Sequence, residues 1–535
     1  MQRRWQICEQ PVITDLAAMT ESWCREVADV VVIGAGIAGL ILAQRLCSKG
    51  LSVTVLESGG YQPTAESASL NQAELLTHAY RGATEGRARC LGGTSTLWGG
   101  AMIPFEATDM LAHPAGWELG WGPAHAELMC YLPEIERLFE LPHGAYEAPE
   151  YAQSADGTHL DFNGRWAKWP AFRLRNLASV LAAPLRHETR LRVWVNATVT
   201  RLPVNESGLV TGAIATSLSG ITLSVSAPTV IVAAGAIEST RLLLVLDRQN
   251  DERLFAPDQT LGRYFYDHLS APVADLAPAS RAALNQLTGF RFEGSGMRNL
   301  RFELSAEARV RHRLPGAFAH VGFTTKGPGG FDALRSLLQA VQRRQLPRTA
   351  DLALLAANLP WLARAVWWRY VRHQLLAPSD ARFELHVVME QEPARRNQIT
   401  LSRERIDALG MPVAVIDWQV TDRDLNHMST VCERMIDSWR RSRASGLASV
   451  IPRPMADVSA AMIRGGGIYH PGGTTRIGRA ANRGVVDDRL RVHRIPNLRT
   501  VSTAVFPSGG SANPTLMLML YALRLADDVA EASRQ

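Results

Sequence analysis

The sequence has few of the features that assign a chain to a specialised class. Its 535 residues include only six cysteines, and their spacing fits neither a disulfide framework nor a metal site. We therefore expect free, buried thiols in a reducing compartment, the cytoplasm, and no bound metal. The cysteines are Cys8, Cys24, Cys47, Cys90, Cys130 and Cys432.

Long runs of one charge are also missing, and no secretory signal is expected. The formal net charge is only +6, with basic residues scattered along the chain, so no nucleic-acid-binding groove is predicted. Arg3 and Arg4 are not followed by the apolar stretch of a signal peptide. Residues 501–523 are uncharged and long enough to cross a bilayer, but their Gly- and Pro-containing centre would leave backbone groups unpaired in lipid. This stretch is predicted to be buried protein.

A βαβ unit is predicted in residues 28–60. The β-branched run at 30–33 predicts a strand buried on both faces, and residues 52–56 predict a second one. Helical spacing over residues 40–47 connects them. Together these elements predict an α/β domain with a parallel, Rossmann-like sheet.

Three glycines and one acidic residue in this unit match the pattern of a dinucleotide-binding site. Gly34 permits the tight turn, Gly36 allows backbone amides to approach a pyrophosphate, and Gly39 allows the helix to pack on the strand. The helix N-terminus then faces the pyrophosphate with its partial positive charge. Glu57 can accept hydrogen bonds from a ribose and would repel a 2′-phosphate.

A second glycine-rich run, Arg-Ala-Arg-Cys-Leu-Gly-Gly-Thr-Ser-Thr-Leu-Trp-Gly-Gly, occupies residues 87–100. Its two glycine pairs suit neither a helix nor a strand. Such backbone can wrap closely around a flat or phosphorylated ligand, or it can form a structural loop between domains. We favour the ligand-binding interpretation.

The remaining chain predicts a second domain. A surface helix is expected within residues 1–27, ahead of the first strand, and another helix at 421–445. Between these, alternating strand-like pieces separated by turns predict a mostly antiparallel sheet. The pieces are residues 300–304, 317–324, 383–390, 399–401 and 413–418.

Residues 331–376 predict a helical insertion rich in arginine and tryptophan, broken at Pro347 and Pro360. Such a segment could contact a membrane or act as a lid. We favour an insertion packed against its own domain, and no membrane contact is expected.

The C-terminal segment contains the residues with the clearest chemistry. His470 stands in a Tyr-His-Pro-Gly-Gly-Thr turn, which can leave its imidazole facing a ligand. A second loop, residues 509–515, has Asn513 and Pro514 just before an apolar helix. The N-terminus of that helix would direct its amides at an anionic ring system.

Four blocks of the sequence resemble the glucose–methanol–choline (GMC) family of FAD-dependent oxidoreductases, in its bacterial branch. The blocks are the βαβ unit, Leu-Gly-Gly-Thr-Ser with Trp-Gly-Gly, residues 234–242, and the Tyr-His-Pro-Gly-Gly-Thr-Thr-Arg-Ile-Gly segment at 469–478. The resemblance covers nearly the whole chain. Trp98 and Ser502 depart from the usual family pattern.

The resemblance implies a role for each matching residue. His470 would be the base toward a substrate hydroxyl, and Asn513 its partner. The implied FAD-binding residues are Gly34, Gly36, Gly39, Glu57, Gly92, Gly93, Thr94, Ser95, Val199, Thr503, Asn513 and Thr515. Non-covalent binding is expected, because Leu97 stands where some related sugar oxidases carry a flavin-linking histidine.

The resemblance also implies a division of the chain into interleaved domains, α+β overall. The FAD-binding domain would comprise residues 27–105, 191–275 and 465–535. The substrate domain would comprise residues 106–190 and 276–464.

The implied reaction is oxidation of an alcohol to a carbonyl, with hydride transfer to flavin N5. A sugar-like or polycyclic small molecule is the expected substrate. The electron acceptor could be oxygen, a quinone or a redox protein. The alternative is a flavin-bound lyase of the same fold, in which FAD is structural and His470 shuttles protons.

Overall fold

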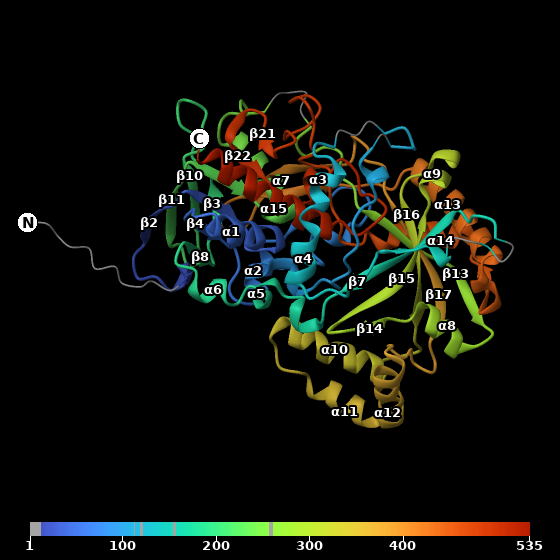
Figure 1. The fold of residues 1–535 in the computed structure, drawn as a ribbon. Coiled ribbons are helices and arrows are strands. Elements are labelled where there is room, and N and C mark those ends of the chain that lie inside the picture. Colours follow the sequence, from blue (N-terminus) through green and yellow to red (C-terminus); the bar gives the residue numbers. More distant parts are fainter. Residues whose placement is uncertain are drawn as a thin grey trace, which may run out of the picture.

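The computed structural model describes residues 12–111, 113–117, 121–151, 154, 157–255 and 260–534. A seven-stranded sheet of order β1-β8-β4-β3-β12-β22-β21 forms one half of the molecule (Figure 1). Its strands run parallel, except that β21 pairs antiparallel with β22. The strands are β1 (Ile13–Asp15), β3 (Val30–Ile33), β4 (Val53–Leu56), β8 (Leu191–Val195), β12 (Thr229–Val232), β21 (Arg491–Val492) and β22 (Ile495–Thr500).

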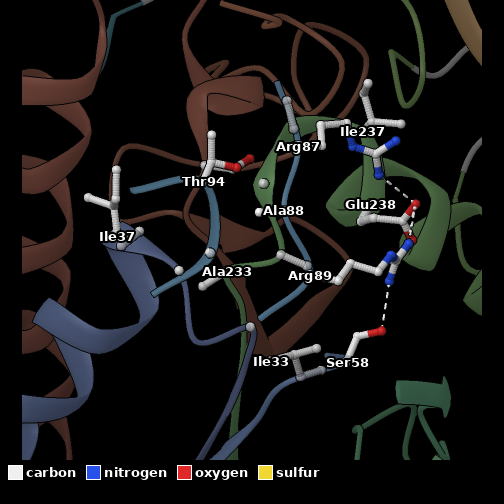
Figure 2. A pocket seen from close by; sticks show the side chains of 18 of the residues that line it. Ile33, Ile37, Ser58, Arg87, Ala88, Arg89, Thr94, Ala233, Ile237 and Glu238 are labelled. Atoms are coloured by element: carbon white, nitrogen blue, oxygen red, sulfur yellow. Dashed lines mark hydrogen bonds and ion pairs between the residues drawn. The ribbon is translucent and has the colours of Figure 1, made fainter. Parts of the chain in front are cut away.

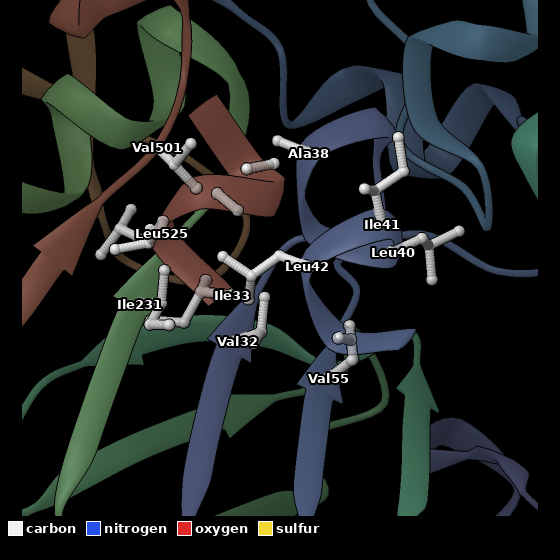
Figure 3. Close-up of a cluster of buried hydrophobic side chains, with 14 of the residues drawn as sticks. Val32, Ile33, Ala38, Leu40, Ile41, Leu42, Val55, Ile231, Val501 and Leu525 are labelled. Carbon is white, nitrogen blue, oxygen red and sulfur yellow. The ribbon is translucent and has the colours of Figure 1, made fainter. Parts of the chain in front are cut away.

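The predicted βαβ unit is confirmed as β3, helix α1 (Ile37–Ser48) and β4. Every residue of both strands is buried, as expected for parallel strands covered on both faces. Figure 3 shows apolar side chains of these strands meeting those of α1 and of the C-terminal helix α15 (Thr515–Ala532), among them Val32, Leu42 and Leu525. The stretch 501–523 is incorporated into this core, as predicted.

The second large sheet is antiparallel throughout, as predicted, and it contains the predicted pieces 300–304, 317–324 and 383–390. The prediction was wrong for residues 399–401 and 413–418, which pair with each other in a separate three-stranded sheet. Its order is β20-β13-β17-β16-β15-β7-β6, with β14 added against β15. The strands are β6 (Glu147–Ala148), β7 (Phe162–Trp169), β13 (His268–Pro278), β14 (Arg291–Glu293), β15 (Gly296–Leu304), β16 (Ala317–Thr324), β17 (Arg382–Glu390) and β20 (Ala448–Pro452).

The described part of the N-terminal segment differs from the prediction. The helix expected within residues 1–27 is wrong for the described part, which forms β1 and β2 (Trp23–Val27) around the 3₁₀ turn η1 (Leu16–Ala18). β1 adds to β8, and β2 adds to β11 (Thr222–Ser226). Pairing with these sheet edges satisfies the backbone groups that a helix would otherwise satisfy internally. Residues 1–11, with Cys8, lie outside the described part.

The remaining strands belong to two smaller sheets, of order β2-β11-β10-β9 and β18-β19-β5. They are β5 (Ala73–Leu75), β9 (Thr198–Arg201), β10 (Gly212–Thr216), β18 (Gln398–Ile406) and β19 (Pro412–Asp417). The five described cysteines are free, as expected, but Cys130 is exposed. It directly follows the five-residue helix α3 (His125–Met129).

The other helices cover the sheets or connect them. They are α2 (Ala65–Ser69), α3 (His125–Met129), α4 (Leu132–Leu138), α5 (Leu177–Val180), α6 (Pro184–His187), α7 (Gly235–Arg248), α8 (Arg281–Thr288), α9 (Ala306–His312), α10 (Gly330–Arg343), α11 (Thr349–Ala357), α12 (Leu359–Trp367), α13 (Asp422–Arg441) and α14 (Met455–Gly465). Among the described residues, none of the helices is both long and apolar enough to traverse a bilayer. Helices α10, α11 and α12 project below β14 in Figure 1, away from the seven-stranded sheet.

Candidate active site

A cavity lies where β3, β4 and β12 end, at the carboxyl edge of the parallel sheet. Ligands of open α/β sheets bind at this edge. Eight of the predicted cofactor-binding residues line the cavity. They are Gly34, Gly36, Glu57, Gly93, Thr94, Val199, Thr503 and Thr515.

The glycines around the cavity either face open space or allow close approach of backbone segments. A Cβ built on Gly36 would meet no atom within 4 Å, whereas one on Gly39 would lie 1.9 Å from the Gly34 carbonyl oxygen. Gly36 therefore faces open space, and Gly39 allows the helix to pack closely on the turn. Gly93 has a φ of +54°, and its Cβ would lie 2.8 Å from Gly36 Cα. The two glycine-rich runs thus lie directly against each other.

The rest of the second glycine run is held by hydrogen bonds. The Gly92 amide donates to the Ala35 carbonyl at 2.9 Å. Ser95 Oγ donates to the Gly92 carbonyl at 2.6 Å and accepts from the Leu177 amide at 2.9 Å. Gly92 and Ser95 therefore shape the loop, while Gly93 and Thr94 line the cavity. Residues 92–97, here called the flavin loop, form a cradle suited to FAD.

Glu57 lies where a ribose-binding acid is expected. Its Oε2 accepts from the Ala35 amide at 2.8 Å, and its Oε1 accepts from the Gly59 amide at 2.9 Å. Burial raises the pKa of Glu57 to about 7, although these amides favour the ionised form. Each oxygen retains a lone pair for a ribose hydroxyl.

Two arginines that the sequence did not single out also line the cavity (Figure 2). Arg87 and Arg89 each place a guanidinium nitrogen 2.9 Å from Glu238. Arg89 also donates to Ser58 Oγ at 2.9 Å. Burial alone would raise the pKa of Glu238, but Arg89, Arg241 and Arg87 hold it well below its usual range. The Arg-Ala-Arg sequence ahead of the glycine pair was the available signal.

The second predicted constellation is present beside this cavity. His470 Nε2 lies 3.1 Å from Asn513 Nδ2, and Asn513 Oδ1 lies 2.5 Å from Arg301 Nη1. A guanidinium only donates hydrogen bonds, so the amide oxygen must face Arg301 and the amide NH₂ must face His470. His470 Nε2 therefore accepts and carries no proton.

The contacts on the Nδ1 side of the His470 imidazole lead to the same assignment, in which Nε2 carries no proton. His470 Nδ1 lies 3.2 Å from His268 Nδ1, and His268 Nε2 lies 2.9 Å from the Gly510 carbonyl oxygen. That carbonyl can only accept, so in neutral His268 the proton is on Nε2 and Nδ1 accepts from His470. Burial lowers the pKa of His470 well below its usual value, and the nearby positive charge of Arg301 acts in the same direction. The imidazole is neutral, with its lone pair toward Asn513.

Asp267 fixes the loop that carries His470. Its Oδ1 accepts from the His470 amide at 2.9 Å, and its Oδ2 accepts from Tyr80 Oη at 2.7 Å. Tyr469, just before the histidine, has a φ of +68°, which costs conformational energy for a residue with a side chain. The buried carboxylate therefore holds a turn that would otherwise relax.

Metal-ligating atoms of Asp267, His268 and His470 also lie within 4.8 Å of one another. The two imidazoles already bond to each other, and the carboxylate already accepts from backbone amides. The hydrogen bonds account for this grouping, and the absence of a bound metal stays a prediction.

Buried acids fix the loop that carries Asn513. Glu390 Oε2 accepts from the Gly510 amide at 2.8 Å, and Asp109 Oδ2 accepts from Ser511 Oγ at 2.8 Å. Burial opposes ionisation of Glu390, but His113 and Arg309 lower its pKa to about 2. An ionised, fully paired carboxylate thus anchors this loop.

Comparisons with known proteins agree with this geometry. Residues 29–271 match the model of an FAD-binding domain, and residues 393–522 match that of the GMC oxidoreductase family. This chain is a GMC oxidoreductase. FAD is its cofactor, and the general reaction of this GMC enzyme is FAD-dependent alcohol oxidation.

Sequence similarity to bacterial relatives covers almost the entire length of this GMC chain. The 6'''-hydroxyparomomycin C oxidase of Streptomyces lividus is 25% identical over 94% of the chain and 91% of the relative. The C-glycoside 3-oxidase of Arthrobacter globiformis is 23% identical over 94% of the chain and 95% of the relative. The pyridoxine 4-oxidase structure from Mesorbium loti shares the fold, with a TM-score of 0.56, 16% identity, and coverage of 94% and 98% of the two chains.

Proposed function

We propose that this enzyme oxidises a hydroxyl group of a sugar-like small molecule, with His470 as base. The observation that carries the proposal is the pairing of His470 Nε2 with Asn513, fixed from both sides by Arg301 and His268. The substrate class rests on relatives named for 6'''-hydroxyparomomycin C and for a C-glycoside.

The arrangement suits removal of a hydroxyl proton. An unprotonated His470 Nε2 can accept that proton, and the NH₂ of Asn513 can donate a hydrogen bond to the same substrate oxygen. Bound FAD supplies the acceptor for the hydride that leaves the carbinol carbon. Two side chains in contact, His470 and Asn513, thus remove the proton and orient the substrate.

Arg301 and His268 position this pair. The guanidinium of Arg301 holds the Asn513 oxygen, so the amide cannot turn without losing a charge-assisted hydrogen bond. His268 accepts the Nδ1 proton of His470 and keeps Nε2 free. The same bond would stabilise the imidazolium that forms when His470 takes up the substrate proton.

Anaerobic mixing with a panel of amino sugars, glycosides and simple alcohols tests the proposal. A sugar-like substrate should bleach the oxidised flavin band, and admission of air then shows whether oxygen restores it. Turnover without bleaching would favour the lyase. Bleaching by simple alcohols alone would overturn the substrate class.

A further inference from the structure

The helices α10, α11 and α12 and the following π-helical turn η7 (Trp368–Arg372) form what we call the helical lobe, residues 330–372. It projects from the body of the molecule (Figure 1). Helix α11 reads Thr-Ala-Asp-Leu-Ala-Leu-Leu-Ala-Ala, yet it has no buried residue. A helix this apolar is ordinarily covered by other protein or by lipid.

Exposed apolar side chains are concentrated on this lobe. Among the described residues, 19 large apolar side chains are exposed, and eight of them belong to it. Leu346 is 92% exposed and Tyr370 is 70% exposed. The others are Val341, Leu352, Leu359, Val366, Trp367 and Val371. Single exposed apolar residues are common on soluble proteins, but such a concentration marks a contact surface.

The same lobe carries nearly all of the chain's excess positive charge. It contains seven arginines and two aspartates, a net +5, against +6 for the whole chain. None of its arginines forms an ion pair with a carboxylate in the described part of the chain, whereas Asp351 bonds to Ser336 at 2.6 Å and Asp332 caps α10. The acids are engaged inside the lobe, so the positive charge remains available to a partner.

Contrary to the expectation from the sequence, the exposed apolar side chains of the helical lobe are not packed against its own domain. We propose that the helical lobe docks on a membrane surface rich in anionic phospholipid. Apolar side chains enter the interface between headgroups and acyl chains, arginines meet the lipid phosphates, and Trp and Tyr favour the headgroup level. The helices have 14, 9 and 9 residues, too few for the roughly 20 that span a bilayer. They can therefore lie on the membrane but cannot cross it.

A second copy of this chain fits the surface less well. Two lobes brought face to face would each bring a net +5, and like charges held in contact repel. An anionic lipid surface satisfies both the apolar and the charged parts of the lobe.

The lobe is attached firmly to the cofactor-binding part of the molecule. Gln342 of α10 is buried, and its Nε2 donates to the carbonyls of Ser95 and Trp98, each at 3.0 Å. Asn176 Nδ2 donates to the Gln342 carbonyl at 3.1 Å. Docking through the lobe would thus place the flavin loop in a fixed orientation above the membrane.

Vesicle flotation of the FAD-loaded enzyme tests the proposal. The enzyme should float with vesicles of equal parts phosphatidylglycerol and phosphatidylcholine, and much less with phosphatidylcholine alone. High salt should weaken flotation, because it screens the arginines. Absence of flotation with anionic vesicles at low salt would overturn the proposal.

Two sets of variants locate the contact. Arg348→Glu/Arg364→Glu/Arg372→Glu should weaken binding by roughly 10²-fold or more, while the control Arg186→Glu/Arg201→Glu/Arg403→Glu, with the same change in charge, should not. Leu352→Ser/Leu359→Ser should also lose binding, unlike Leu76→Ser/Leu111→Ser. FAD content checks that each variant is folded.

Equal flotation of lobe variants and controls would contradict the assignment of the contact to the lobe. Light scattering tests the alternative, in which a second copy of this chain binds the lobe. Self-association that the lobe substitutions abolish, without vesicle binding, would overturn the proposal and assign this face to contacts between copies.

Discussion

The Nδ1 atoms of His470 and His268 face each other at 3.2 Å. Two nitrogens can share this contact only if one carries the proton, and the Gly510 carbonyl gives His268 the accepting role. His268 is therefore a positioning residue for His470. It determines which ring nitrogen of the proposed base is free.

His268→Ala should slow flavin reduction by roughly tenfold or more, because His470 then loses the partner that selects its tautomer. This is part of a general-base contribution of about 10²–10⁴-fold. His268→Gln can both accept and donate, so it should restore much of the rate. His493→Ala is the control, since the imidazole of that half-buried histidine bonds only to the Gly478 carbonyl among its described side-chain contacts. Stopped-flow absorbance of the flavin band measures the reduction rate of all three variants. Equal rates for His268→Ala and His268→Gln would argue against the role of His268 in selecting the tautomer of His470.

The rate of flavin reduction should be insensitive to pH around 6.5. Burial lowers the pKa of His470 well below that value, so the imidazole stays neutral until the solution is more acidic. Below its lowered pKa the ring gains a proton, cannot accept another, and the rate should fall. Asn513→Asp would place a carboxylate beside Nε2, raise the pKa of His470 and move this fall to higher pH. A wild-type rate that already halves near pH 6.5 would contradict the account.

Glu57→Gln should weaken FAD binding more than it slows turnover of the FAD-loaded fraction. The pKa of Glu57 is raised to about 7 by burial, so in wild-type apoprotein the acid is increasingly protonated below that pH. Affinity for FAD should therefore decrease on acidification, and the variant should lose this dependence. Fluorescence titration of apoprotein with FAD measures both effects, with Glu188→Gln as a control outside the cavity. Full FAD occupancy of Glu57→Gln after extensive dialysis would mean that the carboxylate does not hold the ribose.

Acid precipitation should release FAD into the supernatant. Leu97 provides no nucleophile at the position where related sugar oxidases attach their flavin, and Trp98 donates its indole N–H to the Arg175 carbonyl at 2.7 Å. Absorbance of the supernatant and of the redissolved pellet measures the partition. Flavin retained by the pellet would reveal a covalent attachment.

The sequence predicted the parts of the fold that depend on local spacing. The turn between β3 and α1 and the burial of β4 follow from glycine positions and β-branched residues within a few positions of each other. The helix expected within residues 1–27 was wrong because its backbone groups are satisfied by sheet edges supplied by β8 and β11. The division into interleaved domains stays a prediction.

The proposed catalytic pair was predicted, but its supports were not. His268 is 202 positions from His470, and Arg301 is 212 positions from Asn513. Neither has a local sequence signal, because each reaches the site only through the antiparallel sheet, in which His268 begins β13 and Arg301 lies in β15. The chemical identity of a base can be read from a motif, whereas its protonation state depends on partners brought in by the fold.

Anaerobic flavin reduction by His470→Ala tests the central claim most directly. With a substrate identified by flavin bleaching, stopped-flow absorbance compares this variant with wild type and with His493→Ala. The account predicts that His470→Ala retains FAD and reduces it at least roughly 10²-fold more slowly, while His493→Ala remains near wild type. A His470→Ala enzyme with bound FAD and a near-native reduction rate would show that another group is the base.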